Sequence, residues 1–349
     1  MKRSVMAAVL LSLVLAFTGS VLAQGNSQPG KGVEVKPAVA TWSSAEPLEA
    51  IFAALLGDLG YNVQSPKALS NPIFYQSVTQ DAVDFWANGW FPLHNAQLPS
   101  NFKQNAEVLG TIVSHGAIQG YLVDKKDAEK YNIKSLADFK RPEVRKAFDS
   151  TGDGKATLVG CPPGWGCHDV ISYQMKAYGL SKYIHVVTAG YAASFADALA
   201  RYKNGKPILY YTWTPNFTIY KLVPGKDVVW INVPKIDPTK SQKPFEKYMT
   251  QKNIKGAVTN PIKMGFVAND IRTVANKKFV NDNPAAKKLL QEVTIPLADI
   301  SRMTNEINNG QDTKKQVQAM ARSWIANHQS EVDQWLSAAR QAAAQASAH

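Results

Sequence analysis

The stretch "VEVKPAVATWSSAEPLEAIFAALLGDLGYNVQSP", Val33 to Pro66, decides the fold class of this chain. Its first eight residues predict a strand. The following "SSAE", Ser43 to Glu46, has the form of a capping box that opens a helix, and Gly60 is well placed to end that helix. A second strand is predicted in "YNVQSP". The order strand, helix, strand is typical of an α/β sheet.

The same alternation continues towards the C-terminus. Strands are predicted over residues 81–90, 116–124, 206–215, 227–234 and 265–270, and helices over 135–149, 283–293 and 312–345. A chain of 349 residues is too long for one small core and suits two lobes. We therefore predict two lobes, each made of alternating strands and helices.

The first 23 residues have the layout of a secretory signal peptide. Two basic residues precede an apolar run from Val5 to Phe17, and small residues end at Ala23. The run is shorter than the roughly 20 apolar residues that a membrane helix needs, and nothing later in the chain approaches that length. We expect residues 1–23 to be removed and the mature protein to be soluble in the periplasm. Neither cysteine lies near the cleavage point, so no N-terminal lipid anchor is expected.

The formal net charge is +12, but the lysines are scattered in pairs and form no basic run. A solvated basic surface explains this pattern better than a nucleic-acid partner does.

One acidic stretch, Asp149 to Gly160, resembles the first half of a calcium loop, but Gly160 stands where a glutamate should close the site. We interpret the stretch as a turn and expect neither a metal ion nor a cofactor.

The only two cysteines bracket a short loop in "GCPPGWGCHDV", Gly160 to Val170. In an oxidising compartment an even cysteine count favours a disulfide, here between Cys161 and Cys167. So short a closed loop adds only about 2 kcal/mol of stability on the chain-entropy model. Its larger effect would be to fix the backbone around Trp165.

Three of the eight tryptophans sit where a strand gives way to a turn: Trp90 in "NGWFPLH", Trp165 in "PGWGC" and Trp213 in "YYTWTP". In open α/β sheets ligands are usually held at such strand ends. Converging aromatic faces suit a quaternary ammonium group, and each face contributes on the order of 0.5–2 kcal/mol once water is excluded. Trp230, Trp324 and Trp335 lie in apolar or helical patterns and are interpreted as core.

A zwitterionic ligand needs a second, anion-binding pole. His94, four residues after Trp90, could donate a hydrogen bond to a carboxylate. The backbone N–H groups of Gly166 and Cys167 could form a small anion-binding concavity in the disulfide-closed loop. Gly166 has no side chain to block that approach.

The segments "NGWFPLHN", "CPPGWGC", "RYKNGKPILYYTWTPNF" and "PGKDVVWINVP" resemble those of the periplasmic glycine betaine/proline betaine-binding proteins of ProU-type ABC transporters, the ProX family. The resemblance runs over nearly the whole chain after residue 23, and the cysteine-bracketed Pro-Gly-Trp-Gly motif is its most specific part. It implies a type II periplasmic binding protein fold, in which two α/β lobes joined by two crossovers surround a ligand cleft. We expect one lobe to comprise residues 24–120 and 262–349 and the other residues 121–261.

By resemblance, the ammonium box consists of Trp90, Trp165 and Trp213, and the carboxylate ligands are His94 and the backbone amides of Gly166 and Cys167. Ligand would bridge the cleft and stabilise a closed form, which the permease and ATPase subunits of an ABC importer would recognise. We expect a monomer with a small zwitterionic quaternary ammonium ligand.

The sequence departs from the family at Trp42 and Trp86, which have no counterpart in its pattern. If either faced the cleft, the pocket could be shaped for a bulkier betaine. A choline or carnitine binder with the same box is the alternative. Catalysis is not expected, because consecutive residues such as Cys167, His168 and Asp169 do not usually point at one another, and a disulfide-bonded Cys167 has no thiolate.

Overall fold

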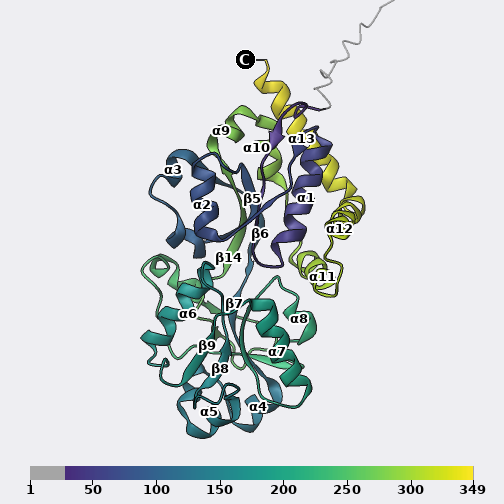
Figure 1. Ribbon diagram of the computed structural model, residues 1–349. Helices are drawn as coiled ribbons and strands as arrows, with labels where there is room; N and C mark the ends of the chain where they lie inside the picture. The colour runs from purple at the N-terminus through teal and green to yellow at the C-terminus, as the bar shows by residue number, and fades with distance from the viewer. Residues whose placement is uncertain (1–27, 349) are drawn as a thin grey trace, which may run out of the picture.

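Two sheets divide the part of the chain that the computed structural model describes, residues 28–348, into two lobes (Figure 1). The predicted signal peptide, residues 1–23, lies outside the described residues. Figure 1 shows the two lobes stacked one above the other, with strands running between them at the waist. We call them the upper and the lower lobe, after their places in that view. The two-lobed α/β architecture expected from the sequence is confirmed.

The upper lobe is built on an antiparallel sheet with the order β5, β14, β6, where the strands comprise Phe85–Phe91, Asn269–Asn276 and Ala106–Ala117. Two short parallel pairs flank it: β1 (Glu34–Val35) with β3 (Asn62–Val63), and β2 (Ala38–Ala40) with β4 (Lys67–Leu69). Its helices are α1 (Ala45–Asp58), α2 (Asn71–Thr79), α3 (Phe102–Asn105), α9 (Lys277–Asp282), α10 (Pro284–Glu292), α11 (Leu297–Asn308), α12 (Lys314–Asn327) and α13 (Gln329–Ala346).

The lower lobe contains a five-stranded sheet with the order β11, β7, β10, β8, β9. The strands are β11 (Val228–Ile231), β7 (Gln119–Asp124), β10 (Leu209–Trp213), β8 (Ala156–Val159) and β9 (Ile184–Val187). Only β7 runs antiparallel to its neighbours. The helices are α4 (Lys125–Lys130), α5 (Pro142–Phe148), α6 (Gly166–Ala177), α7 (Tyr191–Lys203) and α8 (Thr218–Lys221), and a short pair joins β12 (Thr250–Gln251) to β13 (Ile262–Lys263).

The strand pairing shows where the chain passes from one lobe to the other. It first crosses between β6, which ends at Ala117, and β7, which begins at Gln119. It returns between Lys263 of β13 and Asn269, where β14 begins. The lobe boundaries expected from sequence, at 120/121 and 261/262, stay a prediction. Both lie within a few residues of the places where the chain leaves one sheet and enters the other.

Two local predictions are wrong. Ser44 immediately precedes α1, but its backbone is already helical (φ −75°, ψ −5°) and no side chain caps the helix, so the capping box in "SSAE" does not form. The strand predicted over 265–270 begins only at Asn269, because Gly265 has φ +74° and turns the chain before it. Gly60, at φ +91°, does follow the end of α1 as expected.

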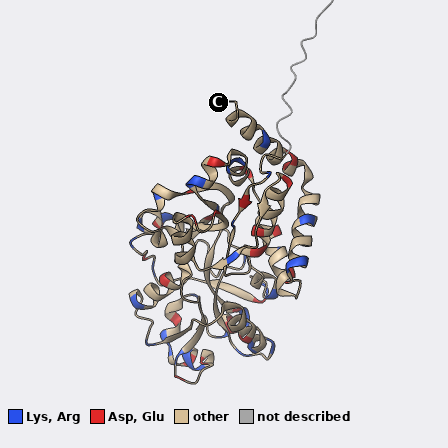
Figure 2. Cartoon of the chain, turned by 45° about the horizontal axis from the view of Figure 1, so that its top comes forward, with Lys and Arg blue, Asp and Glu red and all other residues tan. Residues whose placement is uncertain are grey.

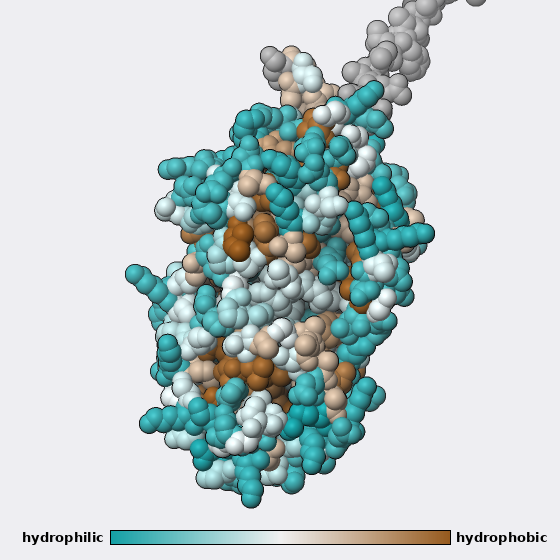
Figure 3. Space-filling model, in the orientation of Figure 1, coloured by the Kyte–Doolittle hydropathy of each residue, from teal (hydrophilic) through white to brown (hydrophobic). Residues whose placement is uncertain are grey.

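The surface fits the interpretation of a solvated basic protein. Figure 2 shows lysine and arginine spread over both lobes, with acidic residues between them. Hydrophilic side chains cover most of the face in Figure 3, and smaller apolar groups flank the paler waist between the lobes. Within residues 28–348, none of the helices combines the length and the apolar character that crossing a bilayer requires.

Candidate functional site between the lobes

A cavity lies where the lobes face each other, and its empty space, counted together with the part open to solvent, is about 290 Å³. All six residues predicted for the ligand site line it, and five further residues complete its wall. The lining consists of Trp42, Asn71, Trp90, Leu93, His94, Gln119, Trp165, Gly166, Cys167, Tyr211 and Trp213. Segments more than 100 residues apart in the sequence thus meet at one place.

The three tryptophans predicted to form the box are all buried, and each comes from a different element. Trp90 lies on β5 of the upper lobe, Trp165 directly precedes α6, and Trp213 ends β10 of the lower lobe. The rings of Trp165 and Trp213 meet edge to face, with centroids 5.5 Å apart and planes at 86°. Tyr191 packs against Trp213 with ring centroids 4.7 Å apart. Trp213 thus packs between the rings of Trp165 and Tyr191, and these contacts restrict the movement of the tryptophan rings.

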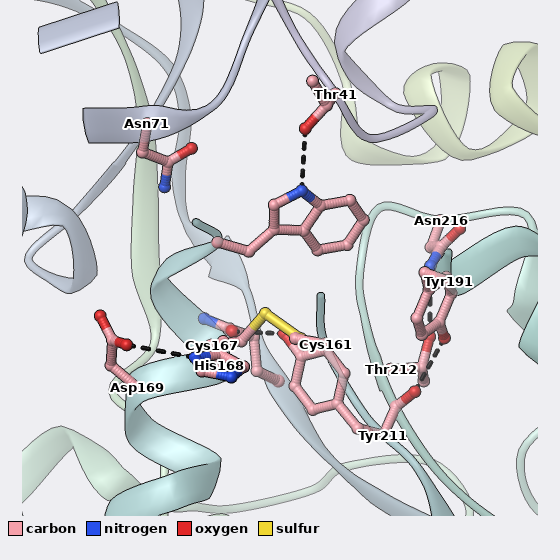
Figure 4. The surroundings of a disulfide bond; sticks show 12 residues. Thr41, Asn71, Cys161, Cys167, His168, Asp169, Tyr191, Tyr211, Thr212 and Asn216 are labelled. Carbon is pink, nitrogen blue, oxygen red and sulfur yellow. Dashed lines mark hydrogen bonds and ion pairs between the residues drawn. A yellow bond between two sulfur atoms is a disulfide. The ribbon is translucent and has the colours of Figure 1, made fainter. Parts of the chain in front are cut away.

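Trp165 is also tied to the opposite lobe. Its indole Nε1 donates a hydrogen bond to Thr41 Oγ1 at 2.8 Å, and Figure 4 shows Thr41 above the ring. Thr41 follows β2 of the upper lobe, whereas Trp165 belongs to the lower lobe. This bond exists only when the lobes are close together.

His94 lies in the turn after β5, in the 3-10 segment Leu93–Gln97, and is buried. Burial lowers its pKa to about 3, so the ring is neutral at neutral pH. Its Nδ1 accepts a hydrogen bond from the Trp90 backbone N–H at 3.2 Å and lies 2.7 Å from the Tyr75 hydroxyl. The ring proton therefore sits on Nε2, which leaves Nε2 as a donor. Nε2 lies 3.0 Å from Asn71 Nδ2, and because both nitrogens are then donors they do not bond each other. A carboxylate placed beside them could accept a hydrogen bond from both.

The amides of Gly166 and Cys167 are the first two of helix α6. The first four N–H groups of a helix have no carbonyl partner within it and lie at the positive end of its dipole, so they favour an anion. The sequence predicted a loop here, and the 12-residue helix was missed. Its signal was the apolar spacing of Val170, Ile171 and Met175 along one face.

The predicted disulfide between Cys161 and Cys167 is present, with Cα atoms 6.0 Å apart (Figure 4). Cys167 thus fixes the start of α6 by its sulfur and also lines the cavity. With both cysteines bonded, the chain has no thiolate for the catalytic alternative. His168 Nδ1 lies 3.3 Å from Asp169 Oδ1, so these two neighbours do face each other, contrary to the expectation from sequence (Figure 4).

The two tryptophans without a counterpart in the family pattern have different places. Trp86 is buried in the upper core, where it stacks on Phe74 with ring centroids 3.8 Å apart, and it does not line the cavity. Trp42 does line it. Sequence reasoning missed Thr41, Asn71 and Gln119 as residues of the site, since none lies in a motif.

The stretch that resembles half a calcium loop is a turn closed by its own side chain. Asp149 accepts hydrogen bonds from the backbone N–H groups of Gly152 at 2.6 Å and Gly154 at 2.9 Å. Among residues 28–348, no group of three or more His, Cys, Asp and Glu side chains is arranged to hold a metal ion.

The family described as the substrate binding domain of ABC-type glycine betaine transport systems matches residues 33–327. The chain belongs to this family. It is 40% identical over 308 residues to the glycine betaine/proline betaine-binding periplasmic protein of Salmonella typhimurium, covering 88% of this chain and 90% of that one. It is 39% identical to the glycine betaine-binding periplasmic protein OusX of Dickeya dadantii, covering 98% and 100%.

Solved structures confirm the fold. Lactococcal OpuAC in its closed conformation with glycine betaine matches with a TM-score of 0.66 and 22% identity, covering 87% of this chain and 99% of that one. A choline-binding protein of an ABC transporter, in complex with choline, matches with a TM-score of 0.68 and 18% identity, covering 90% and 97%. The type II two-lobe architecture expected from the resemblance is consistent with both.

Proposed function

We propose that this protein is the substrate-binding component of an ABC importer and holds glycine betaine, proline betaine or a related betaine between its lobes, for use in osmoprotection. One observation carries the proposal: a single cavity brings Trp90, Trp165 and Trp213 together with His94 and the N-terminus of α6. The names of the relatives from Salmonella and Dickeya support the ligand class.

In this proposal the faces of Trp90, Trp165 and Trp213 surround the trimethylammonium group, which has no hydrogen to donate. Three faces at about 0.5–2 kcal/mol each supply several kcal/mol of cation–π attraction. The carboxylate accepts hydrogen bonds from His94 Nε2 and from the amides of Gly166 and Cys167. Because these groups come from both lobes, the ligand stabilises the closed form.

The protein is further proposed to act as a periplasmic monomer after loss of residues 1–23, with lobes at 24–120 plus 262–349 and 121–261. The closed form would deliver ligand to the permease and ATPase subunits of the transporter. No catalytic step is proposed, since binding and release suffice for this role.

The test is calorimetric titration of the mature protein with glycine betaine and, separately, with choline. We expect one-to-one binding of glycine betaine and weaker binding of choline, which lacks the carboxylate. His94→Ala should weaken glycine betaine binding at least tenfold, since a hydrogen bond to a charged group contributes about 1.5–3 kcal/mol, and should leave choline binding nearly unchanged.

If the protein bound choline as tightly as glycine betaine, the choline or carnitine alternative would be favoured. The proposed role of His94 as a carboxylate ligand would then be wrong. No binding of either compound would refute the proposed ligand class.

A further inference from the structure

Trp42 lies beside both proposed poles of the ligand. It follows β2, is 6% exposed and lines the cavity. Its ring centroid is 5.6 Å from that of Trp165, with planes at 73°, and 6.0 Å from that of His94, with planes at 70°. Trp165 belongs to the proposed ammonium box and His94 to the proposed carboxylate site. The Trp42 indole therefore borders the space that separates the two poles.

Trp42 is held in this position by neighbours that leave it little freedom. Its Nε1 donates to Asn88 Oδ1 at 3.1 Å, and Trp90 Nε1 donates to the same oxygen at 2.6 Å. The Asn88 amide nitrogen in turn donates to the Ser44 carbonyl at 3.3 Å. On its other side Trp42 meets the buried ring of Trp86, with centroids 5.9 Å apart. One buried amide thus positions a box tryptophan and Trp42 together, and Trp86 blocks withdrawal of Trp42 into the core.

We propose that Trp42 is a specificity-determining wall that limits how far apart the ammonium and carboxylate groups of the ligand can be. The inference rests on the proposed function and deepens it. An indole that fills space beside the ligand removes room for a longer or bulkier linker, which is the opposite of the expectation from sequence that a tryptophan in the cleft would suit a bulkier betaine. A rigid apolar wall discriminates one methylene by about 10- to 200-fold.

The experiment compares two zwitterions that differ by one methylene between nitrogen and carboxylate: glycine betaine and β-alanine betaine. Dissociation constants are measured by calorimetry for the wild-type protein, Trp42→Ala and Trp42→Phe. We expect the wild-type protein to prefer glycine betaine at least tenfold. Trp42→Ala should reduce this ratio at least tenfold, mainly through tighter binding of β-alanine betaine, because the lost indole leaves room for the methylene. Trp42→Phe keeps an aromatic wall and should keep the ratio within about threefold of wild type.

Trp335→Phe is the matched control, because it makes the same change at a tryptophan of α13 that packs on Trp324 and does not line the cavity. In this variant the ratio of the dissociation constants of β-alanine betaine and glycine betaine should equal that of the wild-type protein. Trp42→Leu, which retains more side-chain volume, replaces the alanine variant if the latter does not fold, and should shift the ratio in the same direction. If folded Trp42→Ala or Trp42→Leu protein has the same ratio of dissociation constants as wild type, this inference is wrong. The proposed function would still hold in that case, provided that the wild-type protein binds glycine betaine. Absence of wild-type binding would instead refute the proposed function itself.

Discussion

Adding one methyl group at Gly166 should weaken ligand binding while stabilising the free protein. Gly166 begins α6 in the lower lobe, and a Cβ built on it would lie 2.9 Å from Leu93 Cγ and 3.4 Å from His94 Cδ2 of the upper lobe. Its backbone φ is not in the left-handed region, so alanine fits the backbone. The clash arises between the lobes and is felt only when they close.

The two effects of Gly166→Ala have opposite signs. Overpacking a well-filled contact costs about 1–3 kcal/mol, which would weaken glycine betaine binding roughly 5- to 150-fold. In the open protein the clash is absent, and replacing glycine by alanine within a helix adds about 0.5–1 kcal/mol to the free energy of unfolding. Calorimetry measures the first effect, and urea unfolding without ligand measures the second.

Two further variants sharpen the test. In Gly57→Ala, a Cβ would meet nothing within 4 Å, and Gly57 lies in α1, so this variant should gain stability without losing affinity. Leu93→Ala should restore part of the affinity in the Gly166→Ala background, because it removes the atom that clashes. Affinity of Gly166→Ala within twofold of wild type, or a failure of Leu93→Ala to restore any binding, would refute the reasoning that this contact limits closure.

Thr41→Val should weaken glycine betaine binding about two- to tenfold, because the hydrogen bond from Trp165 contributes about 0.5–1.5 kcal/mol to the closed form. The same change should have no effect in a Trp165→Phe background, where no N–H remains, and additive losses in this double-mutant cycle would contradict the assignment. Burial raises the pKa of Glu49 to about 7. The folded protein therefore retains the Glu49 proton where the unfolded chain loses it, so this stabilisation is complete below about pH 4.5 and is lost as pH rises through 7. Glu49→Gln should add up to about 3 kcal/mol to the free energy of unfolding at pH 8 and nothing at pH 4, as followed by urea unfolding, and equal effects at both pH values would show that Glu49 titrates normally.

The three tryptophans proposed to form the box, which all line the cavity, could be picked out from sequence because local chemistry marks them. Trp90 and Trp165 each stand next to glycine, and Pro215 lies two residues after Trp213; such residues end strands. The disulfide followed from cysteine count and predicted export. These signals are local, so they do not depend on knowing which segments meet in space.

The rest of the site depends on contacts between distant segments, which no local pattern encodes. Thr41 and Trp165 are 124 residues apart, and Trp42 and Asn88 are 46 apart. The start of α1 shows the same limit: Ser43 and Glu46 have the spacing of a capping box, but the helix begins at Ala45 and no side chain caps it.

The arrangement of the two poles explains how a small ligand can control the position of two large lobes. The proposed ammonium box takes Trp90 from the upper lobe and Trp165 and Trp213 from the lower. The proposed carboxylate site takes His94 from the upper lobe and the start of α6 from the lower. Neither lobe completes either pole by itself, so a ligand bound to one lobe alone gains only part of the binding free energy. The remainder becomes available only on closure, and this difference in affinity between open and closed forms is what shifts the equilibrium. A compound with only one of the two charges should therefore bind more weakly and also close the lobes less completely.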